Sequence, residues 1–187
     1  MVDAFTDLSV PSFFVSGDLD VDGTTNLDAV DVDGAVNFAA DVTFADGADI
    51  ITASAGTDNV RIGENAGDSI VSGGTNNVVI GKDAGTAITT GVFNTIIGGL
   101  AGDALTEGTR NVAFGKDALT SDTLGSRSTA LGFAALFSQN FTTATDAHNT
   151  AVGEQAGLNV TTGIQNTLIG ALTGDALTDA DFNFFFF

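Results

Sequence analysis

The residues best placed to do chemistry are aspartates near the N-terminus. Residues 18–23 read DLDVDG, which puts carboxylates at alternate positions and glycine sixth, as at the start of an EF-hand calcium loop. The twelfth position of such a loop needs a bidentate glutamate, and here it is Ala29. Residues 31–34 repeat the pattern as DVDG. We therefore expect no cofactor and no dedicated metal site, and keep weak calcium binding by stacked aspartates as the alternative.

Other catalytic chemistries have few of the residues they need. The chain has one histidine, His148, and no cysteine, which disfavours zinc sites, thiol nucleophiles and Ser/His/Asp triads. Paired carboxylates could serve a glycosidase. However, the acidic residues fall at turn positions of repeats, and no tryptophan or tyrosine is present to stack a sugar. The sequence predicts that the protein is not an enzyme, with a polysaccharide hydrolase as the enzymatic alternative.

The charge balance excludes several kinds of partner. Twenty-four acidic residues against five basic ones give a formal charge of -19. Such a surface repels nucleic-acid backbones and anionic membranes, so we expect no nucleic-acid partner. No apolar run approaches the roughly 20 residues of a membrane span, so we expect no membrane insertion. The N-terminus carries aspartates and no basic residue before its apolar stretch, unlike a secretory signal, which predicts synthesis in the cytoplasm.

The elements that position these residues come from a repeat. A nine-residue phrase recurs seven times between residues 59 and 182, at spacings of 18, 17, 17, 17, 21 and 17 residues. A period this short cannot enclose its own hydrophobic core, so each copy must be one coil of a stacked array. The copies read NVRIGENAG, NVVIGKDAG, NTIIGGLAG, NVAFGKDAL, STALGFAAL, NTAVGEQAG and NTLIGALTG.

Three positions of the phrase have a predicted structural role. The leading asparagine, replaced once by Ser128, should form a ladder between coils or cap the preceding turn. The fourth residue is always large and apolar, and we expect these side chains to stack into one buried column, each contributing about 2 kcal/mol. The glycine that follows predicts a corner with positive φ or a close backbone approach. The predicted structural residues are Asn59, Gly63, Asn77, Gly81, Asn94, Gly98, Asn111, Gly115, Gly132, Asn149, Gly153, Asn166 and Gly170.

One coil can be outlined from the third copy. Residues 94–98 form an apolar strand, a corner follows, residues 100–105 form a second apolar stretch, and residues 106–110 form a polar loop. Two strands and two turns per coil predict an all-β parallel β-roll, because recurrent glycine and β-branched residues disfavour helix. The 21-residue spacing indicates about four extra residues within 139–148, which should bulge out as a loop.

The remaining segments differ from this array. Residues 1–16 contain the only proline and an apolar end, and we interpret them as an N-terminal attachment peptide that docks through Pro11, Phe13 and Phe14. Residues 17–58 are acidic, and apolar residues recur every six positions, as at Val30, Val36 and Val42. This hexad predicts a β-helical shaft in which three chains wrap one axis. Residues 183–187 read NFFFF and are in register to begin a truncated eighth repeat.

The repeats resemble those of known fibrous proteins. The phrase NTAVGEQAG, followed by GIQNTLIGALTG, is similar to repeats of bacteriophage tail fibres and related virion fibres. It is more distantly similar to the β-roll heads of trimeric autotransporter adhesins, whose repeats are shorter. The segment VSGDLDVDGTTNLDAVDVDGAVNF also resembles the fibre shafts of tailed phages. Together these similarities cover residues 15–182.

The resemblance implies an elongated homotrimeric fibre on the exterior of a virion. Its N-terminus would bind a tail, portal or capsid protein, and its far end would reach a host surface receptor. The expected function is therefore that of a structural viral tail fibre in host-cell adsorption. The alternatives are a capsid or collar fibre, a bacterial trimeric surface adhesin and a fibre-borne polysaccharide hydrolase.

Overall fold

The computed structural model describes residues 56–187, which contain ten β-strands and no helix. Within these residues, therefore, no helix is long and apolar enough to cross a membrane. Most strands are three residues long, and they recur with the period of the repeat. The strands are β1 Val60–Ile62, β2 Val78–Ile80, β3 Thr95–Ile97, β4 Val112–Phe114, β5 Gly125–Ser126, β6 Thr129–Leu131, β7 Thr145–Asp146, β8 Thr150–Val152, β9 Thr167–Ile169 and β10 Phe184–Phe186.

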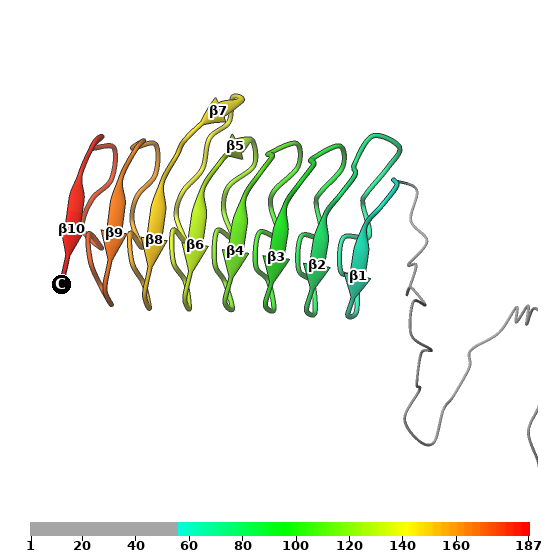
Figure 1. Ribbon diagram of the computed structural model, residues 1–187, viewed down its shortest axis with the longest axis horizontal. Coiled ribbons are helices and arrows are strands. Elements are labelled where there is room, and N and C mark those ends of the chain that lie inside the picture. Colours follow the sequence, from blue (N-terminus) through cyan, green and yellow to red (C-terminus); the bar gives the residue numbers. More distant parts are fainter. Residues whose placement is uncertain (1–55) are drawn as a thin grey trace, which may run out of the picture. The chain divides into compact units, whose positions relative to one another are not determined.

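Eight of these strands form one parallel sheet in the order β1-β2-β3-β4-β6-β8-β9-β10. Each strand pairs with the same positions of the next repeat, for example Ile96 with Ala113, and Ala113 with Ala130. The coils follow one another along the row of strands from cyan to red in Figure 1. The chain is thus an all-β parallel solenoid of about seven turns, which confirms the predicted β-roll class.

The second half of each coil is not the second strand that we predicted. In the third coil, residues 98–104 form turns, because Gly98 (φ 134°) and Leu100 (φ 58°) leave the extended conformation. The coils still bond to each other here, as in the hydrogen bond from Gly102 N to Ala118 O at 2.9 Å. Stacking therefore continues all around the coil without a second strand.

The buried column is also one residue away from the predicted one. From the second to the seventh copy the third residue of the phrase, such as Val79, Ile96 or Leu168, is fully buried, and the fourth residue points outward. Exposure of 55% at Ile62 and 49% at Phe114 contradicts the expectation that the fourth residues form a core column. Because neighbouring residues of a strand point to opposite sides, only one of these two positions can face the interior.

The interior is narrow and lies between the strands and the turns of the same coil. Alanines in the turns, such as Ala84 and Ala101, face the strand residues, and a larger apolar residue four positions later completes the layer. In the second and third coils that residue is Ile88 and Leu105. The core is thus a stack of thin layers, each closed by its neighbours, as expected when no repeat can bury its own apolar face.

The extra residues of the longest spacing lie where they were expected. β7 pairs in parallel with β5, at Gly125 with Thr145 and Ser126 with Asp146, and forms a separate two-stranded sheet. Figure 1 shows β7 projecting beyond the edge that the other coils share. Residues 142–144, at the tip of this bulge, are exposed. The insertion therefore decorates the solenoid without interrupting its main sheet.

Candidate functional site

The predicted asparagine ladder is present and is almost entirely buried. Asn94 illustrates its bonding: its backbone N–H donates to Oδ1 of Asn77 at 2.9 Å, and its Nδ2 donates to the carbonyl of Gly108 at 2.9 Å. Its own Oδ1 accepts from the backbone N–H of Asn111 at 3.0 Å. The carbonyl bonded by Nδ2 lies at the end of the same coil. Each asparagine therefore joins its coil to the next, as the predicted ladder requires, whereas its Nδ2 caps the turn at the end of its own coil and not the turn that precedes it.

The ladder continues to the last described coil. Asn59 Nδ2 donates to Gly74 O, and Asn166 Nδ2 to Ala180 O, both at 2.9 Å. The backbone N–H of Asn183 donates to Oδ1 of Asn166 at 2.9 Å. Residues 183–187 thus stack as an eighth copy in register, and β10 pairs with β9.

Ser128 interrupts the ladder, and Gln139 compensates for it. The serine N–H still donates to Oδ1 of Asn111 at 2.9 Å, but its short side chain cannot supply an amide. Gln139 reaches across instead: its Oε1 accepts from Asn149 Nδ2 at 2.8 Å, and its Nε2 donates to Ser128 Oγ at 3.0 Å. All four of these side chains are buried. The exchange of asparagine for serine is therefore tied to a glutamine eleven residues later.

Gln139 also contacts Asp122, a carboxylate buried within the solenoid. Its Nε2 donates to Asp122 Oδ2 at 2.6 Å, and the backbone N–H groups of Gly125 and Phe141 both donate to Oδ1 at 3.0 Å. Burial raises the pKa of Asp122 above its ordinary value of 3.8, and these hydrogen bonds partly oppose the shift. Sequence reasoning missed both residues. The signal was available, because they stand where other coils have Ile88, Leu105 or Val160.

The predicted glycine corners have the predicted geometry. The seven glycines that follow the strands have φ between 126° and 139°. A Cβ on Gly98 would lie 2.5 Å from the carbonyl oxygen of Gly115, and one on Gly115 would lie 2.4 Å from that of Gly132. Both reasons that we gave for glycine at these corners are therefore confirmed. The backbone has a positive φ, and the next coil is too close to leave room for a Cβ. These corners set the spacing of the stack.

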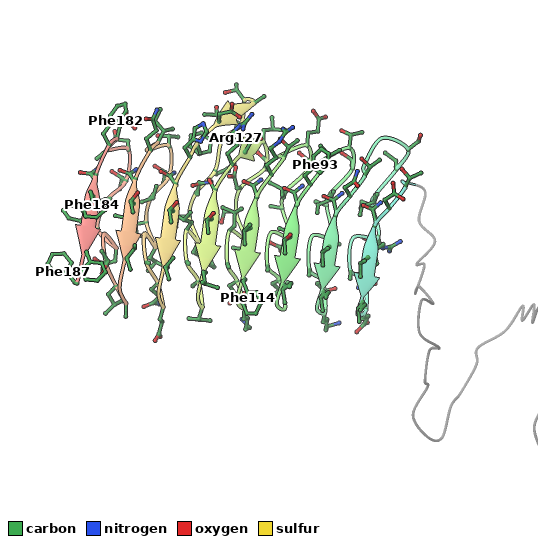
Figure 2. The ribbon with its side chains drawn as sticks, in the orientation of Figure 1. Phe93, Phe114, Arg127, Phe182, Phe184 and Phe187 are labelled. Atoms are coloured by element: carbon green, nitrogen blue, oxygen red, sulfur yellow. The ribbon has the colours of Figure 1, made fainter. Side chains whose placement is uncertain are left out.

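The outward side of the main sheet is a continuous uncharged surface, which we call the outer sheet face. It is formed by the second and fourth residues of the phrase, which flank the buried third residue. Phe114 and Leu131 are 49% and 41% exposed, and Figure 2 shows Phe114 at the end of β4 and Phe184 on β10. The face comprises Val60, Ile62, Val78, Ile80, Thr95, Ile97, Val112, Phe114, Thr129, Leu131, Thr150, Val152, Thr167, Ile169, Phe184 and Phe186.

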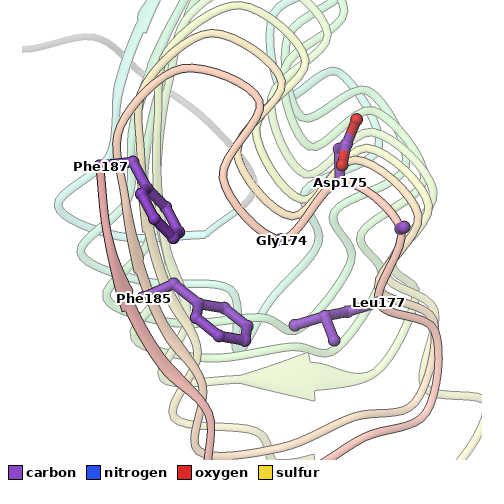
Figure 3. Close-up of a pocket in the computed structure, with 6 residues that line it drawn as sticks. Gly174, Asp175, Leu177, Phe185 and Phe187 are labelled. Atoms are coloured by element: carbon purple, nitrogen blue, oxygen red, sulfur yellow. The ribbon is translucent and has the colours of Figure 1, made fainter.

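An open apolar pocket lies at the last coil. It is lined by residues 174–177 together with Phe185 and Phe187, whose rings stack at 6.3 Å between centroids. Figure 3 shows Phe185 and Leu177 facing each other across it and Asp175 at its rim. A single carboxylate lines this pocket. The two acids that a glycosidase needs are therefore not both supplied by its lining.

The other predicted sites lie partly outside the described residues. The attachment peptide with Pro11, Phe13 and Phe14, the hexad rows, and the DLDVDG and DVDG segments all precede residue 56. From residue 56 onward, no group of three or more His, Cys, Asp or Glu side chains is arranged to hold a metal ion. His148 is exposed at the base of the bulge, directly before the asparagine of the sixth copy.

Comparison with known proteins adds no assignment. No protein-family model matches this sequence, and neither the curated proteins nor the solved structures include a match.

Proposed function

We propose that the protein is a structural fibre of a virion, specifically a tail fibre, that assembles as a homotrimer and takes part in host-cell adsorption. In this proposal the N-terminal segment binds a tail, portal or capsid protein, and residues 17–58 form a three-chain shaft. The solenoid lies on the exterior of the particle and reaches toward a host receptor. The proposal rests on the resemblance of the repeats and on one structural observation.

That observation is the outer sheet face. It spans all eight strands of the main sheet and carries no charged side chain, although the chain has a net charge of -19. Twelve of its sixteen residues are apolar and the other four are threonines, and contiguous, largely apolar surfaces mark interaction sites in soluble proteins. Fourteen of its sixteen residues lie on β1–β9, so the surface does not depend on the phenylalanines of the last strand.

A second and third copy of the chain are the partners that fit this face best. The surface repeats with the rise of one coil, and an identical chain repeats with the same rise, so every layer meets a matching layer. Closed symmetry around one axis lets three identical faces cover each other. Another partner would need the same period along its whole length. A rod assembled in this way becomes longer with each coil, which suits a fibre.

The mass of the assembly in solution tests this proposal. Light scattering on the full chain should give three times the 18.8 kDa of one chain. Leu131→Asp places a charge on the outer sheet face and should weaken the assembly, so that dilution lowers the measured mass at higher protein concentrations than for the wild type. Leu172→Asp is the matched control, because Leu172 is 53% exposed at a turn position where other coils carry Asp83 and Asp117. A monodisperse wild-type monomer contradicts the proposed trimer.

Location distinguishes the virion fibre from its alternatives. Antibodies raised against residues 59–182 should label the tails of particles in electron micrographs. Label on the capsid or collar would favour that kind of fibre instead. Label on bacterial cells, and none on particles, would favour a surface adhesin and contradict the proposed function.

A further inference from the structure

The corner before each strand presents one side chain per coil, and we call this row the corner ridge. It consists of the residue that precedes the ladder position, and all of its members have positive φ. Their side chains are exposed at the start of the main sheet, where Figure 2 labels Phe93, Arg127 and Phe182 along one edge. The members are Asp58, Asn76, Phe93, Arg110, Arg127, His148, Gln165 and Phe182.

The middle of this ridge gathers the basic side chains of the solenoid. Arg110, Arg127 and His148 occupy three consecutive coils and are three of the six Lys, Arg and His residues in the chain. Backbone hydrogen bonds join the corners of successive coils. Arg110 N donates to Val92 O at 3.0 Å, and Arg127 N donates to Thr109 O at 2.9 Å. Adjacent coils lie about 4.8 Å apart, so the side chains rise from neighbouring points.

These guanidinium groups are only partly neutralised. Arg110 forms no ion pair within the described residues, although 24 acidic residues are present in the chain. Its guanidinium lies over the ring of Phe93 at 5.4 Å, which leaves the edge of the group free to donate hydrogen bonds. Arg127 contacts Asp146 through Nε at 2.9 Å, and 41% of its side-chain surface remains exposed. Like charges at equivalent corners of adjacent coils repel each other, and a bridging anion relieves the repulsion.

The bulge supplies a wall beside these cations. Asp146 belongs to β7, and the exposed residues Thr142 and Thr143 lie at the tip of the same insertion. Their hydroxyl groups can donate and accept hydrogen bonds, and the 51% exposed ring of Phe93 offers an apolar surface. Hydroxyls, a flat apolar ring and bidentate cations together match a sugar that bears a carboxylate.

We propose that the corner ridge at Arg110, Arg127 and His148, with Phe93 and the bulge, binds a surface polysaccharide that carries carboxylate groups. The inference rests on the proposed function and names the class of receptor that this fibre recognises. The charges of the ligand must be more widely spaced than those of a nucleic acid, because the net charge of -19 repels a dense polyanion. Carboxylates spaced along a sugar chain can meet the ridge without approaching the acidic remainder of the surface.

The test is binding of the full chain to immobilised polygalacturonate, with neutral dextran as the background. Arg110→Gln/Arg127→Gln should weaken binding about tenfold or more, because it removes two charge-assisted contacts. The variant should fold, since Gln165 occupies the same ridge position with φ 55°. Lys82→Gln/Lys116→Gln is the charge-matched control, because it also removes two exposed cations, which lie after the glycine corners. It should change binding by less than about twofold.

Three results overturn the inference. They are wild-type binding to polygalacturonate no stronger than to dextran, equal losses in the two double variants, and tighter binding to a poly(glycerol phosphate) than to polygalacturonate. None of them bears on the trimer mass or on the antibody labelling of particles. The ridge proposal can therefore fail while the proposed fibre stands, and the labelling can fail while the ridge still binds the polysaccharide.

Discussion

Asparagine recurs at the ladder position because this buried site needs a short side chain with both a donor and an acceptor. Asn94 accepts from the next coil and donates to the end of its own coil, as described above. Serine is too short for both tasks, and at Ser128 the coil recruits Gln139 to complete the bonding. Of the two residue types at this position, asparagine reaches both the next coil and the end of its own coil with one side chain, and serine does not.

Removing one ladder asparagine should destabilise the solenoid strongly. Asn94→Ala leaves the N–H of Asn111 and the carbonyl of Gly108 buried without their partner. Each such group costs about 1–3 kcal/mol, so we expect a loss of about 2–5 kcal/mol in the free energy of unfolding. Urea denaturation measures it. Asn159→Ala, at an exposed asparagine that bonds Asp175 O, should cost less than about 1 kcal/mol. Equal losses at the two positions contradict the ladder's role.

Asp122 should make the stability of the solenoid depend on pH. Its pKa in the folded protein is raised above 3.8, so the folded state holds more protons than the unfolded chain between these two pKa values. Stability therefore falls as the pH rises through this window, and the full cost of the buried charge is present above it. Relative to Asp122→Asn, which does not titrate, the wild type should gain stability as the pH falls from about 7 to about 4.

Urea unfolding of both proteins across this range gives the comparison. The exposed Asp68→Asn variant reports the general effect of removing one carboxylate from an acidic chain. A difference between wild type and Asp122→Asn that stays constant over the whole range contradicts the assignment of the pH effect to Asp122.

The coil is the element on which the fold depends, and two coils fill their interior from a different position. In the fourth and fifth coils the strand residues are Ala113 and Ala130, smaller than Ile96 before them. Leu119 and Leu136 fill the space from positions where the first three coils have glycine, and both adopt positive φ (53° and 49°). This conformation costs about 1–2 kcal/mol for a residue other than glycine, similar to what a buried leucine side chain contributes.

Two neighbouring glycines provide a test of the coil corner. Gly98→Ala would place a Cβ 2.5 Å from the Gly115 oxygen at a φ of 134°, and should lower the free energy of unfolding by more than about 3 kcal/mol. Gly99→Ala meets nothing closer than 3.7 Å and should be neutral or stabilising by up to about 1 kcal/mol. Thermal unfolding measured by circular dichroism distinguishes them. Similar effects of the two substitutions would falsify the close approach of adjacent corners.

For the whole molecule, the dominant electrostatic feature is the charge of -19. Most of the ion pairs in the described residues are exposed, such as Lys82 with Glu64, and pairs of this kind contribute little. Thirteen of the 24 acidic residues, against all five Lys and Arg residues, lie in residues 56–187, so part of this repulsion acts within the stacked coils.

Salt should therefore stabilise this protein. Raising NaCl from about 20 mM to about 300 mM shortens the screening length to a few ångströms and weakens the repulsion between coils. The urea midpoint should rise, and assembly through the uncharged outer sheet face should become tighter, as measured by light scattering over a dilution series. A midpoint that falls with added salt would show that attractive ion pairs outweigh the repulsion.

The sequence by itself determined the period, the parallel stacking, the ladder and the glycine corners. These follow from repetition, because residues one period apart must occupy equivalent places, and because few residue types suit a left-handed corner or a buried amide site. It also located the bulge, since four additional residues in a regular array have to leave it.

Only the tertiary structure decided which side of the strand is inside. In NTIIG and NVAFG several neighbouring positions are apolar or neutral, so the pattern does not distinguish the two faces. The larger residues, such as Phe114 and Leu131, suggested a core, yet they point outward, and the interior of these coils is filled by Ala113 and Ala130 together with Leu119 and Leu136. The pairing of Asp122 with Gln139 likewise joins residues of two coils, and it became visible only when those coils were stacked.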